Sequence, residues 1–223
     1  MRIITAGQVD YQQAWAWQKD LAAQRAANTI QDTLLVLAHP HTYTIGRSGS
    51  RDNLLLDKAV CRERGITVLD VDRGGDITYH GPGQLVAYPI LDLGQPQADG
   101  RLLKADYVGY LRRLEDVLIA TIAAFGLHGF REEGYTGVWT GSPPAKIAAI
   151  GVRVNAKGIS THGIALNIDP DLSYFAGIIP CGITDRPVTS MGRLLGADCP
   201  PWEAVQDVFI ETFISMFQHK EQG

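Results

Sequence analysis

The stretch KIAAIGVRVNAKGISTHGIALNI, residues 146–168, holds two strand-like runs joined by the turn-forming residues NAKG. Two such runs with a short connector predict an antiparallel hairpin. If Val154 pairs with Ile159, Ile150 lies across from Gly163, and the small-residue segments 149–151 and 163–165 become neighbours. Small residues on adjacent strands leave room either for a ligand or for close packing against a helix. The hairpin therefore predicts a candidate ligand slot, and both uses of it stay open.

The segments around this hairpin mix helical and strand-like patterns without strict alternation. Helices are expected at residues 11–27 after an Asp10 N-cap, at 56–64, at 107–125 with Asp106 as the cap, and at 202–217. Strands are expected in TLLVLAHP, HTYTIG, ITVLDVD and QLVAYPILDL. No linker or repeat divides the chain, so a single catalytic domain over residues 1–223 is expected. This order predicts an α+β (mixed α/β) fold with a mixed, largely antiparallel sheet flanked by helices, not a doubly wound nucleotide fold.

Composition and charge argue against several classes of function. Lys and Arg total 20 against 24 Asp and Glu, so the net charge of -4 argues against a nucleic-acid partner. No window approaches the roughly 18 apolar residues of a membrane span, and the N-terminus has no signal-like apolar region. A cytoplasmic protein without a membrane partner is therefore expected. The three cysteines form no CxxC pair, which indicates neither a disulfide framework nor a zinc site, and neither a metal nor a cofactor is expected.

A second informative stretch is RGGDITYHGPGQ, residues 73–84. A phosphate-binding P-loop requires a lysine, and this stretch contains none. A dinucleotide fingerprint requires a helix after the glycines, whereas a strand pattern follows them here. We therefore expect a loop whose backbone approaches a ligand at Gly74 and Gly75, with Arg73 and His80 in its lining. Simple hairpin turn chemistry is the alternative, and it leaves the arginine and the histidine unexplained.

Two further residues are candidates for chemistry. Cys181 lies in IIPCGIT, between a proline and a glycine, and Lys146 begins the hairpin directly after two prolines and an alanine. A nucleophilic cysteine needs a lowered pKa, which a nearby cation supplies. Taken singly, a free cysteine is more often an inert buried residue, and a lysine at a strand start is more often solvated. The pair is therefore a candidate only jointly.

These residues coincide with the motifs of one family. RGGDITYHGPGQLVAYP resembles the signature of the lipoyl(octanoyl) transferases, and KIAAIGVRV, HGIALNID and IPCGI resemble its other motifs in the same order. The resemblance spans residues 73 to about 192. It implies an enzyme that transfers an octanoyl group from octanoyl-acyl carrier protein to a lysine of lipoyl domains, in 2-oxoacid dehydrogenases and the glycine cleavage H protein. It also implies the fold shared by lipoate ligases and biotin protein ligases.

The resemblance assigns roles residue by residue. It implies that Cys181 accepts the acyl group as a thioester and that Lys146 lowers its pKa. For the incoming amine, Lys146 is the favoured base and His80 the weaker candidate. The implied substrate-binding residues form three segments: Arg73, Gly74, Gly75, Asp76, Ile77, Thr78, Tyr79 and His80; Ala149, Ile150 and Gly151; and Gly163, Ile164 and Ala165.

Partners and competing functions follow from the same resemblance. Acidic carrier and lipoyl domains predict a positive rim built from some of five arginines, and a monomeric enzyme is expected. These arginines are Arg47, Arg51, Arg62, Arg64 and Arg186. The alternatives are an ATP-dependent lipoate or biotin-type protein ligase, an amidotransferase between carrier domains, and a non-catalytic acyl-binding protein. The ligase is the weaker because the sequence has PCG but no GRG-rich ATP loop.

Overall fold

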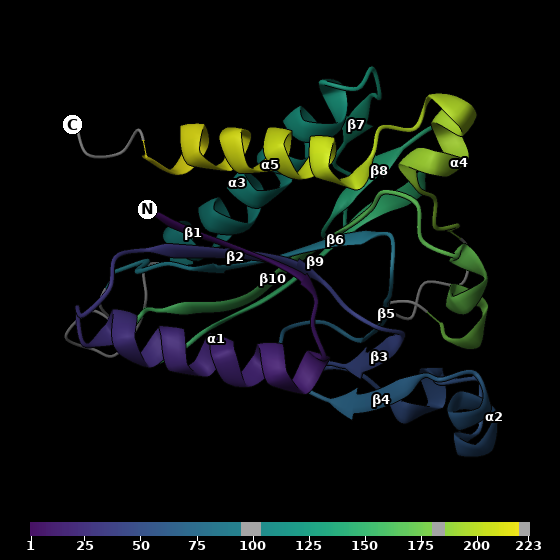
Figure 1. Ribbon diagram of the computed structural model, residues 1–223, viewed down its shortest axis with the longest axis horizontal. Helices are drawn as coiled ribbons and strands as arrows, with labels where there is room; N and C mark the ends of the chain where they lie inside the picture. Colours follow the sequence, from purple (N-terminus) through teal and green to yellow (C-terminus); the bar gives the residue numbers. More distant parts are fainter. Residues whose placement is uncertain (95–103, 180–185, 219–223) are drawn as a thin grey trace.

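A computed structural model describes residues 1–94, 104–179 and 186–218 of the chain. In this part the larger sheet has seven strands in the order β1-β2-β6-β10-β9-β8-β7 (Figure 1). Strands β1 and β2 run parallel and the other neighbours antiparallel, which confirms the mixed, largely antiparallel sheet. The strands are β1 Arg2–Gln8, β2 Thr33–Ala38, β6 Gln84–Ile90, β7 Gly129–Phe130, β8 Val138–Thr140, β9 Ala145–Val154 and β10 Ser160–Asn167.

A smaller sheet lies beside one end of the larger one (Figure 1). In the described residues it has three strands in the order β4-β3-β5. These are β3 Thr42–Ile45, β4 Thr67–Asp70 and β5 Ile77–His80, with the short helix α2 Lys58–Glu63 beside them. Ile77 and Tyr79 are fully buried in a cluster with Tyr43. The small sheet therefore has its own apolar core, which holds the end of the glycine-rich stretch in place.

The helices form layers on both faces of the larger sheet. Helix α1, Tyr11–Ala26, covers one face, while α3, Lys104–Ala123, and α5, Trp202–Gln218, cover the other (Figure 1). Side chains alternate along a strand, so Leu35 packs toward α1 and Leu34 belongs to the core under α3 and α5. The shorter helical segments are η1 Arg51–Asn53, η2 Leu172–Gly177, α4 Met191–Leu195 and η4 Gly196–Asp198. Within the described residues, no helix is long and apolar enough to cross a membrane.

Several predicted elements are confirmed and others need correction. The Asp10 side chain caps α1, accepting from the Gln12 and Gln13 amides at 2.9 and 3.2 Å. Asp106 is not a cap, because α3 already begins at Lys104. Strands β1, β7 and β8 were not predicted from the sequence. The 73–84 stretch is not one loop: residues 77–80 form β5, because they pair with β3 and bury all four side chains.

The hairpin exists, but its predicted register is wrong by one residue. Val154 pairs with Ser160, so Gly151 faces Gly163 and Ala149 faces Ala165. The turn is shorter than expected: Asn155 N–H donates to Ile159 O at 3.0 Å, and Gly158 takes a left-handed φ of 80°. A three-residue loop with such a glycine is a preferred hairpin connection. The two small-residue segments thus lie directly opposite each other.

Candidate active site

The hairpin and the glycine-rich stretch enclose a pocket of about 440 Å³, counted to its open mouth. We call it the central pocket. Eleven of the fourteen predicted substrate-binding residues line it: Arg73, Gly74, Gly75, Thr78, His80, Ala149, Ile150, Gly151, Gly163, Ile164 and Ala165. Tyr11 of α1, Tyr88 of β6 and His162 of β10 complete the wall. Segments that are distant in sequence therefore meet at one cavity.

Arg73 joins the two sheets at the pocket. Its Nη2 donates to Thr44 O at 2.6 Å and to Thr44 Oγ1 at 2.8 Å, while Nη1 donates to Gly74 O at 3.0 Å. The residue is 6% exposed, so its charge is held in the protein by these oxygens. A planar guanidinium can bind several oxygens in fixed directions at once. Arg73 therefore sets the backbone position of the glycine loop against the small sheet.

The glycines at the pocket allow close backbone approach. Gly74 N–H donates to Val152 O at 3.0 Å, and a Cβ on Gly151 would come within 2.9 Å of Gly74 O. A Cβ on Gly163 would collide with the backbone oxygen of Ala87 on the neighbouring strand. Gly151 and Gly163 both line the pocket, and the close contacts that they permit are to the glycine loop and to β6 instead of to a helix.

A cluster of buried histidines and tyrosines forms the side of the pocket next to α1. His39 Nε2 lies 2.6 Å from Tyr88 Oη and its Nδ1 lies 2.7 Å from Val9 O, so Nδ1 carries the proton and Nε2 accepts from the tyrosine. The Tyr11 ring stacks on His80 at 5.5 Å between centroids. Burial lowers the pKa of His39 to about 4 and holds the pKa of His80 well below its usual range. The rings of His39 and His80 are therefore neutral near pH 7.

His162 stands at the end of this cluster with an unusual backbone. Its φ of 56° is in the left-handed region, and its amide donates to Gln18 Oε1 at 2.8 Å. Nε2 lies 2.8 Å from Asp72 Oδ1, and Nδ1 lies 3.4 Å from Tyr11 Oη. Burial, with Arg73 and Arg153 nearby, lowers the pKa of the His162 ring to about 3. The neutral ring thus donates to Asp72 and accepts from Tyr11.

Three predicted site residues point elsewhere. Ile77 is fully buried in the small-sheet core. Asp76 accepts from the Ser50 amide at 3.1 Å and from its neighbour's amide at 2.7 Å, so it organises the loop. Tyr79 Oη forms a hydrogen bond with His41 Nδ1 at 2.9 Å, and the residue lines a different cavity, the one around Lys146. Alternation along β5 explains the placement of Ile77 and Tyr79, since Thr78 and His80 occupy the opposite face, while Asp76 precedes the strand.

Lys146 lies in a second cavity that adjoins the central pocket. This lysine pocket has about 340 Å³ of free space, counted to its open mouth, and shares Thr78, Ala149 and Ala165 with the central pocket. Lys146 is 9% exposed, and its Nζ lies 5.2 Å from the centroid of the Trp139 ring. Its amide donates to Pro187 O at 2.9 Å, and its carbonyl accepts from Thr189 N–H at 2.9 Å. The backbone of Lys146 is therefore paired with the chain that follows residue 186.

A buried carboxylate fixes the loop beside Lys146. Glu115 of α3 is fully buried; its Oε2 accepts from Arg112 and Arg131 at 2.7 and 2.8 Å, and its Oε1 accepts from the Gly137 amide at 3.1 Å. Gly137 has a φ of 116°, and a Cβ there would lie 3.0 Å from Lys146 Cε. Glu115 therefore positions a backbone segment that touches the lysine side chain.

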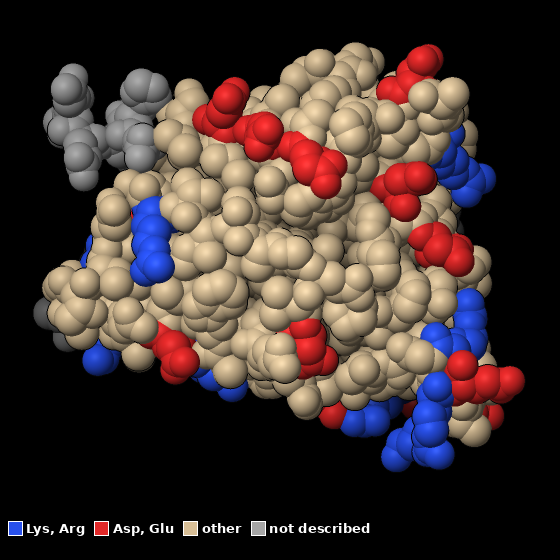
Figure 2. Space-filling view, in the orientation of Figure 1, with Lys and Arg blue, Asp and Glu red and all other residues tan. Residues whose placement is uncertain are grey.

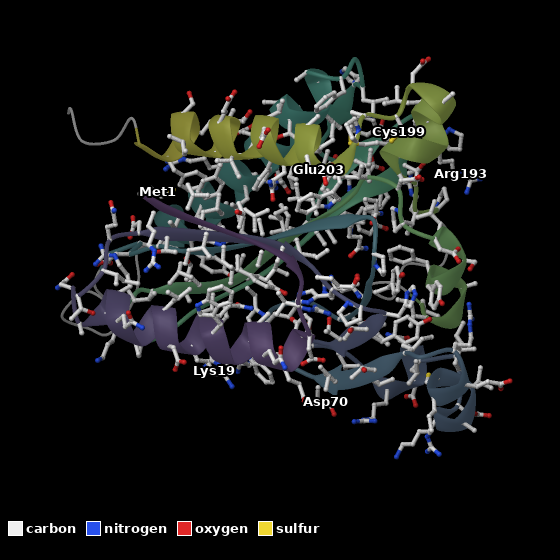
Figure 3. All side chains as sticks on the ribbon, viewed as in Figure 1. Met1, Lys19, Asp70, Arg193, Cys199 and Glu203 are labelled. Carbon is white, nitrogen blue, oxygen red and sulfur yellow. The ribbon has the colours of Figure 1, made fainter. Side chains whose placement is uncertain are left out.

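Cys181, the predicted nucleophile, lies outside the described residues. Of the other two cysteines, Cys61 is buried in the small-sheet core, and burial together with Asp57 raises the pKa of its thiol. Burial and Asp169 raise the pKa of Cys199, which lies beside α4 on the face of the sheet opposite α1 (Figure 3). A raised pKa opposes thiolate formation. Neither residue is therefore suited to act as a nucleophile.

Three lining residues were missed from the sequence. Tyr11 begins α1, Tyr88 lies within a fully buried strand, and His162 directly precedes a predicted glycine segment. The position of His162 next to Gly163 was a usable signal, because a histidine in an otherwise apolar strand needs partners. Nothing in the local pattern indicated that Tyr11 faces the pocket. In the described part of the chain, no group of three or more His, Cys, Asp or Glu residues is placed to hold a metal ion.

The fold is similar to that of lipoate protein ligases and biotin protein ligases. A bipartite lipoate protein ligase from Thermoplasma acidophilum superposes with a TM-score of 0.71 at 15% identity, covering 97% of this chain and 83% of that one. A biotin protein ligase from Leishmania major superposes with a TM-score of 0.52 at 14% identity, over 96% and 74%. At these identities the likeness shows the fold alone, which is the fold that the sequence resemblance implied.

Sequence comparison identifies the family. Residues 10–214 match the lipoyl protein ligase A/B catalytic domain. An octanoyltransferase of Chloroflexus aggregans is 46% identical over 221 residues, 97% of this chain and 96% of that protein. Another, from Chloroflexus aurantiacus, is 50% identical over 200 residues, 88% and 86%. The chain belongs to the lipoyl protein ligase A/B catalytic domain family, and the resemblance found in its motifs is confirmed.

Proposed function

We propose that this chain is an octanoyltransferase of protein lipoylation, and that all 223 residues act as one catalytic domain. Its octanoyl donor is octanoyl-acyl carrier protein, and its acceptor is a lysine of a lipoyl domain. Relatives that are 43–50% identical over most of the chain are octanoyltransferases. The observation that carries the proposal is the lysine pocket, which adjoins the largely apolar central pocket and holds Lys146. Cys181 precedes Pro187, the backbone partner of Lys146, by six positions.

In the first half-reaction, the Cys181 thiolate attacks the thioester carbon of the donor. A new C–S bond forms to Cys181 and the C–S bond to the carrier breaks. The leaving carrier thiolate takes a proton from the Lys146 ammonium, which becomes neutral. The ammonium favours the thiolate beforehand, because an opposite charge within about 4–6 Å stabilises the ionised form. One thioester replaces another, so the activation of the acyl group is retained.

In the second half-reaction, the acceptor lysine amine attacks the octanoyl-Cys181 thioester. A C–N bond forms, Cys181 leaves as the thiolate, and the proton released by the amine passes to neutral Lys146. His80 is the poorer base for this step, because burial holds the pKa of its ring well below the usual range. The enzyme thus returns to its starting protonation state.

The charged surface supports docking of acidic partners at one end of the molecule. Three of the five predicted rim arginines, Arg47, Arg51 and Arg62, are exposed on the small-sheet end, where blue and red residues intermingle in Figure 2. Arg51 is paired with Asp70, and Arg186 with Glu132 at 2.9 Å. Red residues follow α5 on the other side (Figure 2), where Glu203, Asp207 and Glu211 are exposed. We propose that the enzyme is monomeric and cytoplasmic, and that it binds both the acyl carrier protein and the lipoyl domain at the small-sheet end.

Mass spectrometry after incubation with octanoyl-acyl carrier protein tests this function. We expect one octanoyl adduct on the wild-type chain, none on Cys181→Ala, and normal adducts on Cys61→Ala and Cys199→Ala. Lys146→Met should slow adduct formation by at least about tenfold at pH 7, because the thiolate fraction falls. An adduct that survives Cys181→Ala would contradict the mechanism.

The alternatives make different demands. A lipoate or biotin-type ligase requires ATP, so transfer from the carrier without ATP excludes it for this chain. An amidotransferase takes its acyl group from a lipoyl-type carrier domain, so rates measured with both donors separate the two transferases. A binding protein forms no covalent adduct.

A further inference from the structure

Three cavities follow one another along the β9–β10 ladder. The lysine pocket reaches from Lys146 to Ala149, and the central pocket continues from Ala149 to Gly151. A third cavity, here called the α1 groove, begins at Arg153 and Thr161. It encloses about 820 Å³ between α1 and the hairpin, counted to its open mouth. Its lining residues are Trp15, Gln18, Lys19, Ala22, Ala23, Ala26, Asp72, Arg153, Asn155, Lys157 and Thr161.

His162 and Asp72 separate the central pocket from this groove. His162 lines the central pocket and is 1% exposed, while Asp72 lines the α1 groove. Their side chains are joined by the 2.8 Å hydrogen bond described above. Asp72 also accepts from Trp15 Nε1 at 3.1 Å and forms an ion pair with Arg153. The partition therefore consists of the His162 ring and the Asp72 carboxylate, and Trp15 and Arg153 brace it from the groove side.

The distance to this partition matches an eight-carbon chain. The lysine and central pockets meet at Ala149, and His162 pairs with Val152, three residues further, which is about 10 Å along a strand. With bonds of ~1.52 Å and angles of ~111°, an extended octanoyl group is ~9 Å long. A chain with its carbonyl where the two pockets meet thus ends at the His162 ring. Longer chains would have to displace the ring from Asp72 and Tyr11.

We propose that His162 is the residue that limits acyl-chain length, closing the central pocket against the α1 groove. This inference rests on the proposed acyl transfer and adds its chain-length selectivity. Removing the imidazole joins the two cavities and gives a longer acyl chain a path past Asp72. The apolar part of that path is the alanine-lined surface of α1, formed by Ala22, Ala23 and Ala26. Lys19, on the same helix (Figure 3), also lines the groove, and its Nζ lies 3.8 Å from the centroid of the Trp15 ring.

The test compares octanoyl- and dodecanoyl-acyl carrier protein as donors. His162→Gly removes the ring, and its backbone suits a residue with φ of 56°, where glycine carries no steric cost. We expect the ratio of kcat/KM for dodecanoyl over octanoyl transfer to rise by at least about tenfold. His162→Asn, which also tolerates this φ but keeps a shorter side chain, should give a smaller rise. Thr161→Ala changes the groove without touching the partition and should leave the ratio at the wild-type value.

The outcomes separate the two proposals. Octanoyl transfer retained in His162→Gly and His162→Asn with an unchanged ratio overturns the role of His162. If the wild-type chain forms no octanoyl adduct, the proposed function fails. The partition is then judged by calorimetric binding of free octanoate and dodecanoate to wild type and His162→Gly. If both variants fold but transfer no acyl group, the same binding measurement is the deciding one. An equal ratio of dodecanoate to octanoate affinity in wild type and His162→Gly would contradict the inference.

Discussion

Arg73 shows how a single side chain connects the small sheet to the site. Its guanidinium reaches Thr44 in β3 on one side and the Gly74 carbonyl on the other, and the glycine loop in turn bonds to β9. A buried cation is stabilised only when its donors are satisfied, and here the satisfying oxygens come from two separate segments. The same bonds that stabilise the charge therefore align the wall of the central pocket.

Arg73→Lys should reduce both stability and activity. An ammonium is a point charge without the fork needed to reach Thr44 and Gly74 together, so charge-assisted hydrogen bonds are lost. We expect the free energy of unfolding to fall by about 2–3 kcal/mol, measured by urea denaturation. Octanoyl adduct formation should slow because the loop loses its anchor. Arg47→Lys, on the exposed surface nearby, is the control and should change the free energy of unfolding by less than about 0.5 kcal/mol. Equal stability of the two variants would contradict the role given to Arg73.

Local sequence patterns identified some of the residues that line the central pocket and missed others. Glycines and an arginine in residues 73–84 indicated a ligand loop, and five of these twelve residues line the central pocket. Asp76, Ile77 and Tyr79 were included because the family resemblance covers the continuous segment 73–80, whereas alternation in β5 directs the side chains of Ile77 and Tyr79 into the small-sheet core. Tyr11 reaches the pocket from a helix more than sixty residues away. Such a contact depends on the packing of α1, which local patterns do not encode.

Helices and strands with clear local sequence signals were predicted, and those without such signals were missed. The hairpin, α1 and α5 were predicted because caps, turn residues and periodicity agree within one segment. The hairpin register depended on whether Gly158 takes a left-handed conformation, which shortens the loop by one residue. Strands β1, β7 and β8 were missed because they gain most of their stability from pairing with other segments. A strand of two residues such as β7 carries no periodicity at all.

Glu115→Gln should disturb the loop that contacts Lys146. The amide cannot accept from Arg112, Arg131 and Gly137 together, and it brings an N–H group toward two guanidinium groups. We expect kcat for octanoyl transfer to fall by about tenfold with little change in KM, because Lys146 rather than the acyl pocket is displaced. Stability should fall by about 1–3 kcal/mol.

Asp116→Asn is the matched control for this prediction. Asp116 is an exposed partner of the same Arg131, at 2.5 Å, and lies next to Glu115 on α3. Exposed ion pairs contribute about 0–1 kcal/mol, so this variant should transfer octanoyl groups at nearly the wild-type rate. If Asp116→Asn lowers kcat as strongly as Glu115→Gln, the effect comes from Arg131 in general and not from the buried contact with Gly137.

At the scale of the whole molecule, the layers concentrate polar groups in one place. Apolar clusters fill both faces of the larger sheet and the inside of the smaller one. His39, His80 and His162 gather where α1, the larger sheet and the smaller sheet meet. The fold class followed from the order of the elements, but this junction did not, since it requires the relative position of two sheets. Its consequence is a dependence of global stability on pH.

The three buried histidines should make the fold weaken early on acidification. The pKa of His39 is lowered to about 4 and that of His162 to about 3, whereas an unfolded histidine has a pKa near 6.5. Between these values the unfolded chain binds more protons than the folded one, so the stabilisation present above pH 6.5 is lost as the pH falls toward 4. From pH 7 to pH 5 each such residue lowers the free energy of unfolding by up to about 2 kcal/mol, before carboxylates titrate appreciably.

Urea denaturation at pH 7, 6 and 5 should show this loss. His39→Gln, which keeps an acceptor for Tyr88, should make the free energy of unfolding depend less steeply on pH. His128→Gln, at an exposed position outside the buried cluster, is the control and should keep the wild-type slope. A pH-independent free energy of unfolding over this range would show that the histidine cluster opens to water without unfolding the chain.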